Sequence, residues 1–126
     1  MIRWFERNYA VAWMIVLIIA GLIFYVSSLI FPYNHPGISL LSVIYHIGIF
    51  FLFSFFLMIA LVRGKNKKIV LLGFVLALAY GFSDEIHQLF VPGRYGSLVD
   101  VFYDGVGVLF ATIIYLIIVE GRKKMP

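Results

Sequence analysis

The chain has 126 residues, of which 63% are hydrophobic and only 13% are charged, and its mean hydropathy is +1.05. Soluble domains usually contain about 25% charged and about 45–50% apolar residues, so a soluble globule of this size would expose too much apolar surface. The composition also excludes a disordered tail, and it argues against a nucleic-acid-binding module despite the net charge of +4. We therefore expect an integral membrane protein.

Apolar stretches separated by polar turns predict a single all-α membrane domain over residues 1–126, an antiparallel bundle of four membrane-spanning helices. The expected helices cover residues 9–31, 38–62, 69–91 and 98–119. The apolar run 10–31 is too long for a cleavable signal and is expected to stay as an anchor. Two prolines and a glycine in 32–37 predict a tight turn, and Pro92-Gly93 predicts another.

The last two helices raise a question of length. Their clean apolar stretches, 69–82 and 105–119, would extend over only about 21–22 Å, against about 30 Å of hydrocarbon core. We expect the polar residues 83–104 to extend both helices into the outer leaflet, facing the interior of the bundle rather than lipid.

The basic residues predict the orientation in the membrane. Nine of the ten lie before the first helix, between the second and third, or after the fourth: Arg3, Arg7, Arg63, Lys65, Lys67, Lys68, Arg122, Lys123 and Lys124. By the positive-inside rule these segments and both termini are cytoplasmic, in a multi-pass protein of the plasma membrane. The turns near 32–37 and 92–97 then face outside.

Polar residues gather at the expected outer ends of all four helices. His46 and Asp104 each lie about 9–12 Å inside their helix ends. Histidines paired with carboxylates perform general acid–base chemistry, and the catalytic candidates are His46, Asp84, Glu85, His87, Asp100 and Asp104. The candidates for substrate binding are Ser27, Ser28, Gln88, Arg94 and Ser97. Helical spacing places Asp84 on one face with His87 and Gln88.

Structural interpretations stay open beside the functional ones. Arg94 would grip a phosphate or carboxylate of a substrate, or instead neutralise Asp84 or Asp100 within the protein. His46 is also compatible with a hydrogen-bonded packing residue, and the serines at 27–28 with hydroxyls that bond back to the preceding turn.

The same side chains also allow a divalent metal cofactor. Imidazole and carboxylate ligands together suit zinc, manganese or iron. The candidate ligands are His46, Asp84, His87 and Asp100, with Asp104 as an alternative to Asp100. No His-x-x-x-His or His-Glu-x-x-His element is present, so a metal-free site stays open as well.

A family resemblance is carried by positions 83–107. The segment reads Ser83-Asp84-Glu85-Ile86-His87-Gln88-Leu89-Phe90-Val91-Pro92-Gly93-Arg94, then Ser97-Leu98-Val99-Asp100, Asp104 and Gly107. It resembles the signature of the VanZ-like family. Ser27 and Ser28 resemble the family's first-helix serine pair, and His46 stands where the second-helix histidine sits. The resemblance covers nearly the whole chain, and it implies a small integral membrane protein related to one associated with resistance to the glycopeptide teicoplanin.

Two functions are compatible with this pattern. The first is a membrane-embedded hydrolase or transferase acting on an envelope lipid or lipid-linked glycan at the outer leaflet. In it His87 or His46 is the general base, and a carboxylate of Asp84, Glu85 or Asp100 orients that base. The second is a non-catalytic protein that binds a wall precursor or modulates another membrane protein, with a structural polar cluster. A solute pathway is disfavoured because the inner halves of the helices are almost purely apolar.

Overall fold

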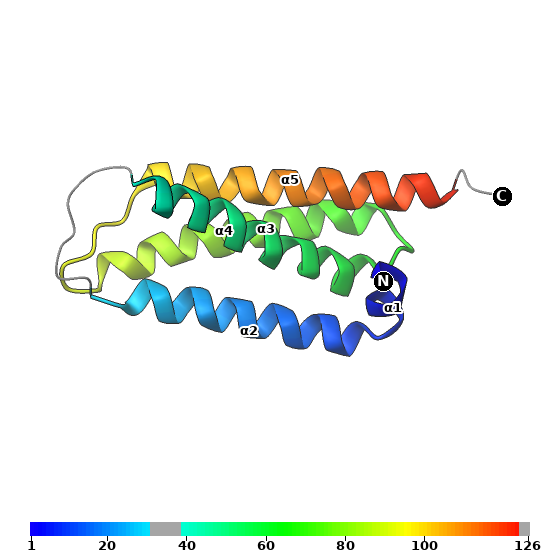
Figure 1. Cartoon of the computed structure of the whole chain (residues 1–126), viewed down its shortest axis with the longest axis horizontal. Coiled ribbons are helices and arrows are strands. Elements are labelled where there is room, and N and C mark those ends of the chain that lie inside the picture. Colours follow the sequence, from blue (N-terminus) through cyan, green and yellow to red (C-terminus); the bar gives the residue numbers. More distant parts are fainter. Residues whose placement is uncertain (31–38, 124–126) are drawn as a thin grey trace.

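The computed structural model describes residues 1–30 and 39–123, and over these ranges the chain forms helices and no strand. Four long helices lie side by side: α2 (Tyr9–Ser28), α3 (Leu40–Val62), α4 (Lys68–Leu89) and α5 (Leu98–Lys123) (Figure 1). Each is long and apolar enough to cross a membrane. The N-terminus and the end of α5 lie at the same end of the bundle. The predicted all-α fold with four spanning helices is confirmed.

The ends of α2 and α3 differ slightly from the predicted ones. α2 ends at Ser28 rather than near residue 31, because the backbone of Leu29 is extended, with φ −72° and ψ 137°. α3 begins at Leu40, because the Ser39 hydroxyl caps it by accepting a hydrogen bond of 3.2 Å from the N–H three residues further on. The predicted turn at 32–37 and the expected helix start at 38 lie outside the described residues.

α4 and α5 are both long enough to span the membrane. α4 continues without a break through the polar residues 83–89, and α5 begins at Leu98, ahead of Asp100 and Asp104. With 22 and 26 residues, the two helices extend over about 33 Å and about 39 Å. Both exceed a hydrocarbon core of about 30 Å, so the polar segments are parts of the spanning helices, as expected.

The distal ends of these two helices also shift by a few residues. α4 ends at Leu89 rather than near residue 91, since Pro92 has no N–H with which to continue the helical hydrogen bonds. α5 runs on to Lys123 instead of ending near residue 119. Its last turn carries Arg122 and Lys123, whose positive charges stabilise the negative end of the helix dipole.

A short helix that the sequence did not predict, α1 (Ile2–Arg7), precedes α2. Asn8 ends it with φ −99° and ψ 53°, and the Asn8 side-chain amide donates to the Trp4 carbonyl at 2.9 Å. The Phe5 ring packs edge-on against Phe56 of α3, with centroids 5.5 Å apart. α1 therefore lies against the end of the bundle that carries the termini (Figure 1).

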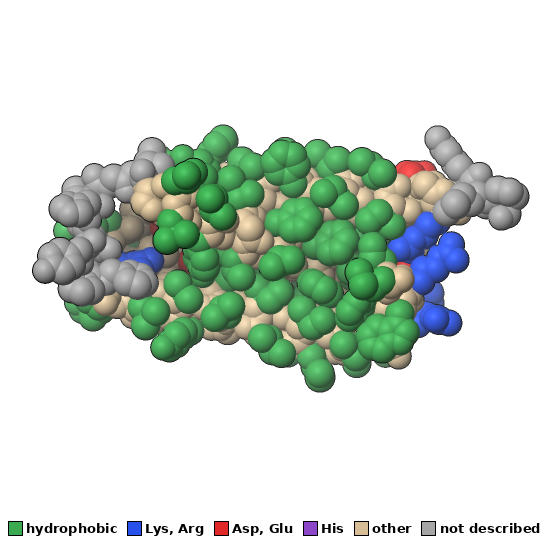
Figure 2. Space-filling model, viewed as in Figure 1, with side chains coloured by type: hydrophobic (Ala, Val, Ile, Leu, Met, Phe, Trp, Pro, Cys, Tyr) green, Lys and Arg blue, Asp and Glu red, His purple; other side chains and the backbone are tan. Residues whose placement is uncertain are grey.

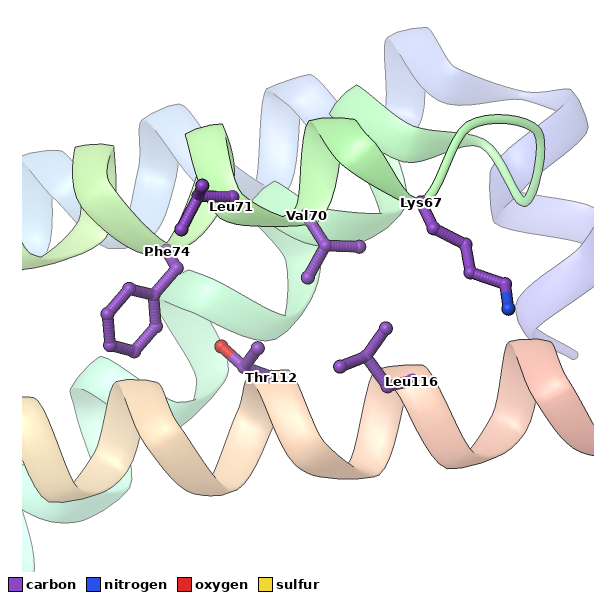
Figure 3. Close-up of a pocket in the computed structure, with 6 residues that line it drawn as sticks. All are labelled: Lys67, Val70, Leu71, Phe74, Thr112 and Leu116. Atoms are coloured by element: carbon purple, nitrogen blue, oxygen red, sulfur yellow. The ribbon is translucent and has the colours of Figure 1, made fainter.

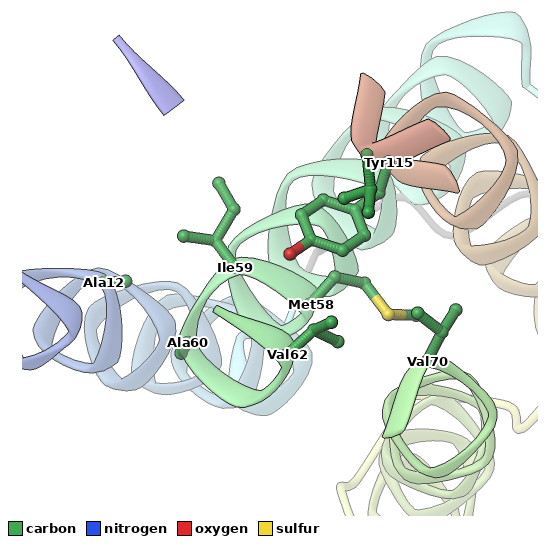
Figure 4. Packing of buried hydrophobic residues seen from close by; sticks show 8 residues of the cluster. Ala12, Met58, Ile59, Ala60, Val62, Val70 and Tyr115 are labelled. Carbon is green, nitrogen blue, oxygen red and sulfur yellow. The ribbon is translucent and has the colours of Figure 1, made fainter. Parts of the chain in front are cut away.

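α3 is the central helix and packs against α2, α4 and α5. Buried side chains from all four long helices meet around its second half (Figure 4): Ala12, Met58, Ile59, Ala60, Val62, Val70, Tyr115 and Val119. Other large hydrophobic side chains point away from the bundle and cover the side seen in Figure 2, as a lipid-facing surface requires. At Gly107 the backbones of α3 and α5 come close, since a Cβ there would lie 2.4 Å from the Ile47 carbonyl oxygen.

A network of hydrogen bonds connects the helices at the end of the bundle that carries the termini. Arg122 Nη1 donates to Glu6 Oε2 at 2.6 Å, and the Tyr115 hydroxyl donates to Glu6 Oε1 at 3.1 Å. The same hydroxyl accepts from the Gly64 N–H at 3.2 Å. Lysine and arginine side chains gather at this end (Figure 2). The network joins α1 to α5 and to the α3–α4 turn, so the basic segments predicted to be cytoplasmic lie together.

Candidate functional site

A buried histidine–aspartate pair joins α3 to α5 near the end of the bundle opposite the termini. His46 Nδ1 lies 2.7 Å from Asp104 Oδ1, and the two side chains are 6% and 2% exposed. Both residues stand six positions after the starts of their helices, which places them at the same depth. His46 Nε2 lies 3.7 Å from Asp100 Oδ2, whose side chain is 25% exposed. The carboxylate at hydrogen-bond distance from His46 is thus Asp104, which was not among the expected orienting residues Asp84, Glu85 and Asp100; of these three, Asp100 faces the other ring nitrogen.

Glu85 of α4 supports the start of α5. Its Oε2 accepts a hydrogen bond of 2.8 Å from the Ser97 N–H, and the Ser97 hydroxyl accepts from the Asp100 N–H at 3.4 Å. Ser97 therefore uses its hydroxyl to cap a helix. Glu85 is 5% exposed, and its second oxygen, Oε1, has no hydrogen-bond partner within residues 1–30 and 39–123.

A second polar contact lies between α2 and α4. Asp84 and Gln88 are 7% and 3% exposed, and Gln88 Nε2 donates to Asp84 Oδ2 at 3.4 Å, so their predicted common face is confirmed. The buried hydroxyl of Ser27 interacts with the Asp84 carboxylate, but no hydrogen bond of good geometry to that hydroxyl is found over the described ranges. This contact adds a further buried carboxylate on α4, next to Glu85 in the sequence.

The other histidine of the motif belongs to a more exposed group. His87 Nε2 lies 2.9 Å from Ser28 Oγ, and its ring stacks on Phe24 with centroids 4.4 Å apart. The Ser28 hydroxyl also donates to the Phe24 carbonyl at 2.7 Å, which is the backbone contact foreseen for the serine pair. A serine has one hydroxyl hydrogen, so His87 is then the donor to Ser28 and does not act on it as a base.

Arg94 lies in the connection between α4 and α5. Its Nη1 donates to the Leu29 carbonyl at 3.3 Å, which ties this connection to the end of α2. Gly93 precedes it with φ 77°, a conformation that glycine adopts at little cost.

The structure thus separates the predicted site residues into groups. Four of them form what we call the acid–histidine cluster, where α3, α4 and α5 meet: His46, Glu85, Asp100 and Asp104. His87 lies instead with Ser28 of α2. Over the described ranges, the residues that bring three metal-ligand atoms within 4.8 Å of one another are His46, Glu85 and Asp104. The candidate ligand set drawn from the sequence included both histidines, whereas His87 lies beside Ser28 of α2 and is not one of these three residues.

Two residues near the cluster were not singled out from the sequence. Gly81 lies one turn before Glu85 on α4, and a Cβ there would be 3.2 Å from Asp104 Oδ2. The Tyr45 ring meets the His46 ring edge-on, with centroids 5.5 Å apart, and its buried hydroxyl has no partner among the described residues. Helical spacing from Glu85 points to Gly81, whereas no sequence signal marks Tyr45.

Grooves run along the contact between α4 and α5. One of about 190 Å³ lies beside the acid–histidine cluster and is lined by Phe82, Glu85, Ile86, Leu89, Gly96, Ser97, Leu98 and Val101. Another of about 280 Å³ lies toward the opposite end and is lined by Lys67, Val70, Leu71, Phe74, Thr112 and Leu116 (Figure 3). Lys67 forms an ion pair with Glu120. The first groove therefore sets a buried carboxylate beside apolar surface, and the second offers no comparable chemistry.

Comparison with known proteins identifies a family for this chain. The model of the family described as VanZ/LLP1 matches residues 8–119 of the chain. The resemblance drawn from positions 83–107 is thereby confirmed. No curated protein and no solved structure matches the chain significantly.

Proposed function

The chain belongs to the VanZ/LLP1 family, and we propose that it binds the polar head of a cell-envelope lipid or lipid-linked glycan and acts on it by acid–base chemistry. The observation that carries the proposal is the buried hydrogen bond of 2.7 Å between His46 and Asp104, with Asp100 3.7 Å from the other ring nitrogen. We place this site at the outer leaflet of the plasma membrane, because the basic segments gather at the opposite end and favour the cytoplasmic side.

The geometry suits His46 as a general base. When Nδ1 donates its hydrogen to Asp104, the lone pair of the imidazole is at Nε2, on the side of the partly exposed Asp100. Nε2 is then able to take a proton from a water or a substrate hydroxyl, and the two carboxylates stabilise the resulting imidazolium. A base positioned in this way contributes about 10²–10⁴-fold to a rate.

An amphiphilic ligand fits the surroundings of this base. The neighbouring groove combines the Glu85 carboxyl group with apolar side chains such as Phe82 and Leu98, which are themselves exposed on the outside of the bundle. A lipid presents hydrocarbon to such a surface and its polar head to the carboxylates and to His46. Arg94 lies at the same end, and its guanidinium group is suited to a phosphate.

The proposal includes a link to teicoplanin resistance. If the lipid-linked glycan is a cell-wall precursor, a protein that binds or modifies it at the outer leaflet changes what the glycopeptide can reach. The membership of the chain in the VanZ/LLP1 family supports this extension.

The second candidate function is binding without catalysis. Several groups predicted to bind substrate form internal hydrogen bonds: Ser28 to Phe24, Gln88 to Asp84, and Ser97 within its helix cap. Groups engaged in this way favour a structural polar cluster, in a protein that sequesters a lipid precursor or modulates another membrane protein.

The test uses the full chain in lipid nanodiscs with a photoreactive polyprenyl phosphate and with a polyprenyl-diphosphate-linked sugar as probes. We expect cross-linking near the acid–histidine cluster and conversion of one probe, detected by mass spectrometry. His46→Gln should reduce conversion at least about a hundredfold. The matched control, Glu120→Gln at the opposite end of α5, should behave as the wild type.

Each outcome separates the two functions. Conversion that is lost in His46→Gln supports an enzyme, and cross-linking without conversion supports a binding protein. Undiminished conversion by a folded His46→Gln variant, or cross-linking that maps away from the acid–histidine cluster, would refute the site. The sequence also predicts that His87→Ala, Asp84→Asn and Asp100→Asn abolish activity with stability intact; misfolding of these variants would make the polar residues structural.

A further inference from the structure

We infer that the chain carries a divalent-cation site whose ligands are His46 of α3, Glu85 of α4 and Asp104 of α5. One ligand atom of each residue lies within 4.8 Å of those of the other two. The three residues are 5%, 5% and 1% exposed. Three helices therefore bring one nitrogen and two carboxylates to a single buried point, where one ion contacts them all after small side-chain movements.

Oxygen atoms without partners are the second observation that points to a cation. Glu85 Oε1 and Asp104 Oδ2 are buried, and neither has a hydrogen-bond partner among residues 1–30 and 39–123. The other oxygen of each side chain is engaged: Glu85 Oε2 by the Ser97 N–H, and Asp104 Oδ1 by His46. Buried polar atoms are nearly always satisfied, and a bound cation is one way to satisfy carboxylate oxygens that have no donor from the protein.

The backbone of α4 leaves room at this point. Gly81 faces Asp104, and a Cβ at Gly81 would stand 3.2 Å from the unpartnered Oδ2. Any larger residue would narrow the space beside that oxygen. Gly81 also lies one helical turn before Glu85, so both face the same side of α4.

The ligand set selects the type of cation. Mg²⁺ and Ca²⁺ are bound mainly by oxygen atoms, whereas one imidazole with carboxylates suits Zn²⁺, Mn²⁺ or Fe²⁺. A neutral imidazole and two carboxylates carry two negative charges together, which a divalent ion neutralises. Such neutralisation matters at a buried site, because unbalanced charge there is strongly unfavourable.

His46 is arranged as a metal ligand with a carboxylate behind it. Its Nδ1 is on the Asp104 side, so in the loaded site the cation takes the place of the hydrogen between Nδ1 and Asp104, and the single hydrogen of the neutral ring moves to Nε2. Nε2 then carries the ring hydrogen and faces Asp100 Oδ2 at 3.7 Å. Carboxylates in this outer position commonly orient metal-bound histidines. Asp100 is thus a positioning residue in the loaded site.

This inference rests on the proposed function only in placing the polar head of a lipid at the acid–histidine cluster, because in the loaded site His46 is a metal ligand and no longer the general base. A bound cation would supply a Lewis acid beside the polar head of the lipid. Metal binding and lipid binding are nevertheless separate measurements, so either can fail alone.

The experiment begins with the full chain purified in detergent and stripped with EDTA. It is dialysed against Zn²⁺, Mn²⁺ or Mg²⁺, and the retained metal is counted by mass spectrometry. We expect one Zn²⁺ or Mn²⁺ per chain and no retained Mg²⁺. X-ray absorption of the zinc-loaded wild type should show one nitrogen and at least two oxygen ligands at about 2.0–2.2 Å. This spectrum depends on no variant.

Variants then test the ligands. Glu85→Gln and Asp104→Asn should lower the zinc affinity at least about tenfold, the lower end of what changes around a metal site cost. The control is Glu120→Gln, a carboxylate of α5 at the opposite end of the bundle and outside the ligand set, and it should retain one ion. In EDTA the melting temperature of Glu85→Gln should not fall below that of the wild type. Added zinc should raise the melting temperature of the wild type and leave that of Glu85→Gln unchanged.

Less than one retained ion per chain, a spectrum without nitrogen, or unchanged affinity in Glu85→Gln would overturn the inference. Repeating the cross-linking in EDTA separates it from the proposed function. If the lipid cross-links to a chain that holds no metal, the cation site is refuted and the lipid proposal stands. If the chain retains metal but no lipid cross-links to it, the lipid proposal is refuted and the cation site stands.

Discussion

Replacing Gly107 by alanine should force α3 and α5 apart beside the acid–histidine cluster. The added Cβ would stand 2.4 Å from the Ile47 carbonyl oxygen and 3.0 Å from the Phe51 nitrogen. Real Cβ contacts are essentially never shorter than 3.0 Å, so the helices must separate by at least about 0.6 Å. Both obstructing atoms belong to the backbone, and no side-chain rotation relieves the contact.

The magnitude follows from two opposing effects. Overpacking costs about 1–3 kcal/mol, and a rigid backbone obstacle places Gly107→Ala near the upper value. Alanine in a helix is favoured over glycine by about 1 kcal/mol. We therefore expect a net loss of about 2 kcal/mol in the free energy of unfolding. Since Ile47 follows His46 in the chain, the same separation should lengthen the contact between His46 and Asp104 and weaken zinc retention.

The assay is unfolding of the full chain in mixed micelles by a denaturing detergent, followed by circular dichroism. Gly105→Ala is the matched control on the same helix, because its Cβ would meet only Leu78 Cδ2 at 3.7 Å, an ordinary contact. That variant should be as stable as the wild type or up to about 1 kcal/mol more stable. If Gly107→Ala unfolds at the same detergent concentration as Gly105→Ala, the close approach of α3 and α5 is refuted.

Three further predictions concern other parts of the bundle. Tyr115→Phe removes hydrogen bonds to Glu6 and to the α3–α4 turn, so the free energy of unfolding should fall by about 1.5–3 kcal/mol; an unchanged value in the same micelle assay would contradict the network. Gly81→Ala should change the free energy of unfolding by less than about 1 kcal/mol, because the helix preference of alanine offsets a mild contact of the added Cβ with Asp104. The variant should nevertheless retain less zinc after dialysis. Full retention would show that the cation does not use the space beside Asp104. The chain has no native cysteine, so a membrane-impermeant maleimide applied outside intact cells should label Tyr95→Cys and not Asn66→Cys. Outside labelling of Asn66→Cys would reverse the orientation.

The number and type of helices could be predicted from the sequence because both depend on local properties. A spanning segment must be apolar over about 20 residues and must satisfy its own backbone hydrogen bonds, so length and composition suffice. The depth of His46 and Asp104 was also accessible, because helical rise converts residue number into distance. The short helix α1 was missed, since six residues carry too little periodicity to mark a helix.

The partners of individual side chains were not accessible in the same way. Sequence spacing places Asp84, His87 and Gln88 on neighbouring positions of one helix, yet the structure directs His87 to Ser28 of α2 and pairs Asp84 with Gln88. A difference of one position changes the direction of a side chain by about 100° around the helix axis. Which neighbouring helix it then meets depends on how that helix is rotated in the bundle.

The sequence by itself therefore determined a four-helix membrane protein with basic segments at one end and polar residues near the other. Only the tertiary structure decided that His46 is held by Asp104, and that Glu85 from a third helix adds an unpartnered oxygen beside them. The physical reason is that hydropathy and charge act on each segment separately, whereas helix rotation is set by contacts between helices. At Gly107 the missing side chain lets α5 approach the backbone of α3, and that approach brings the scattered charges into one site.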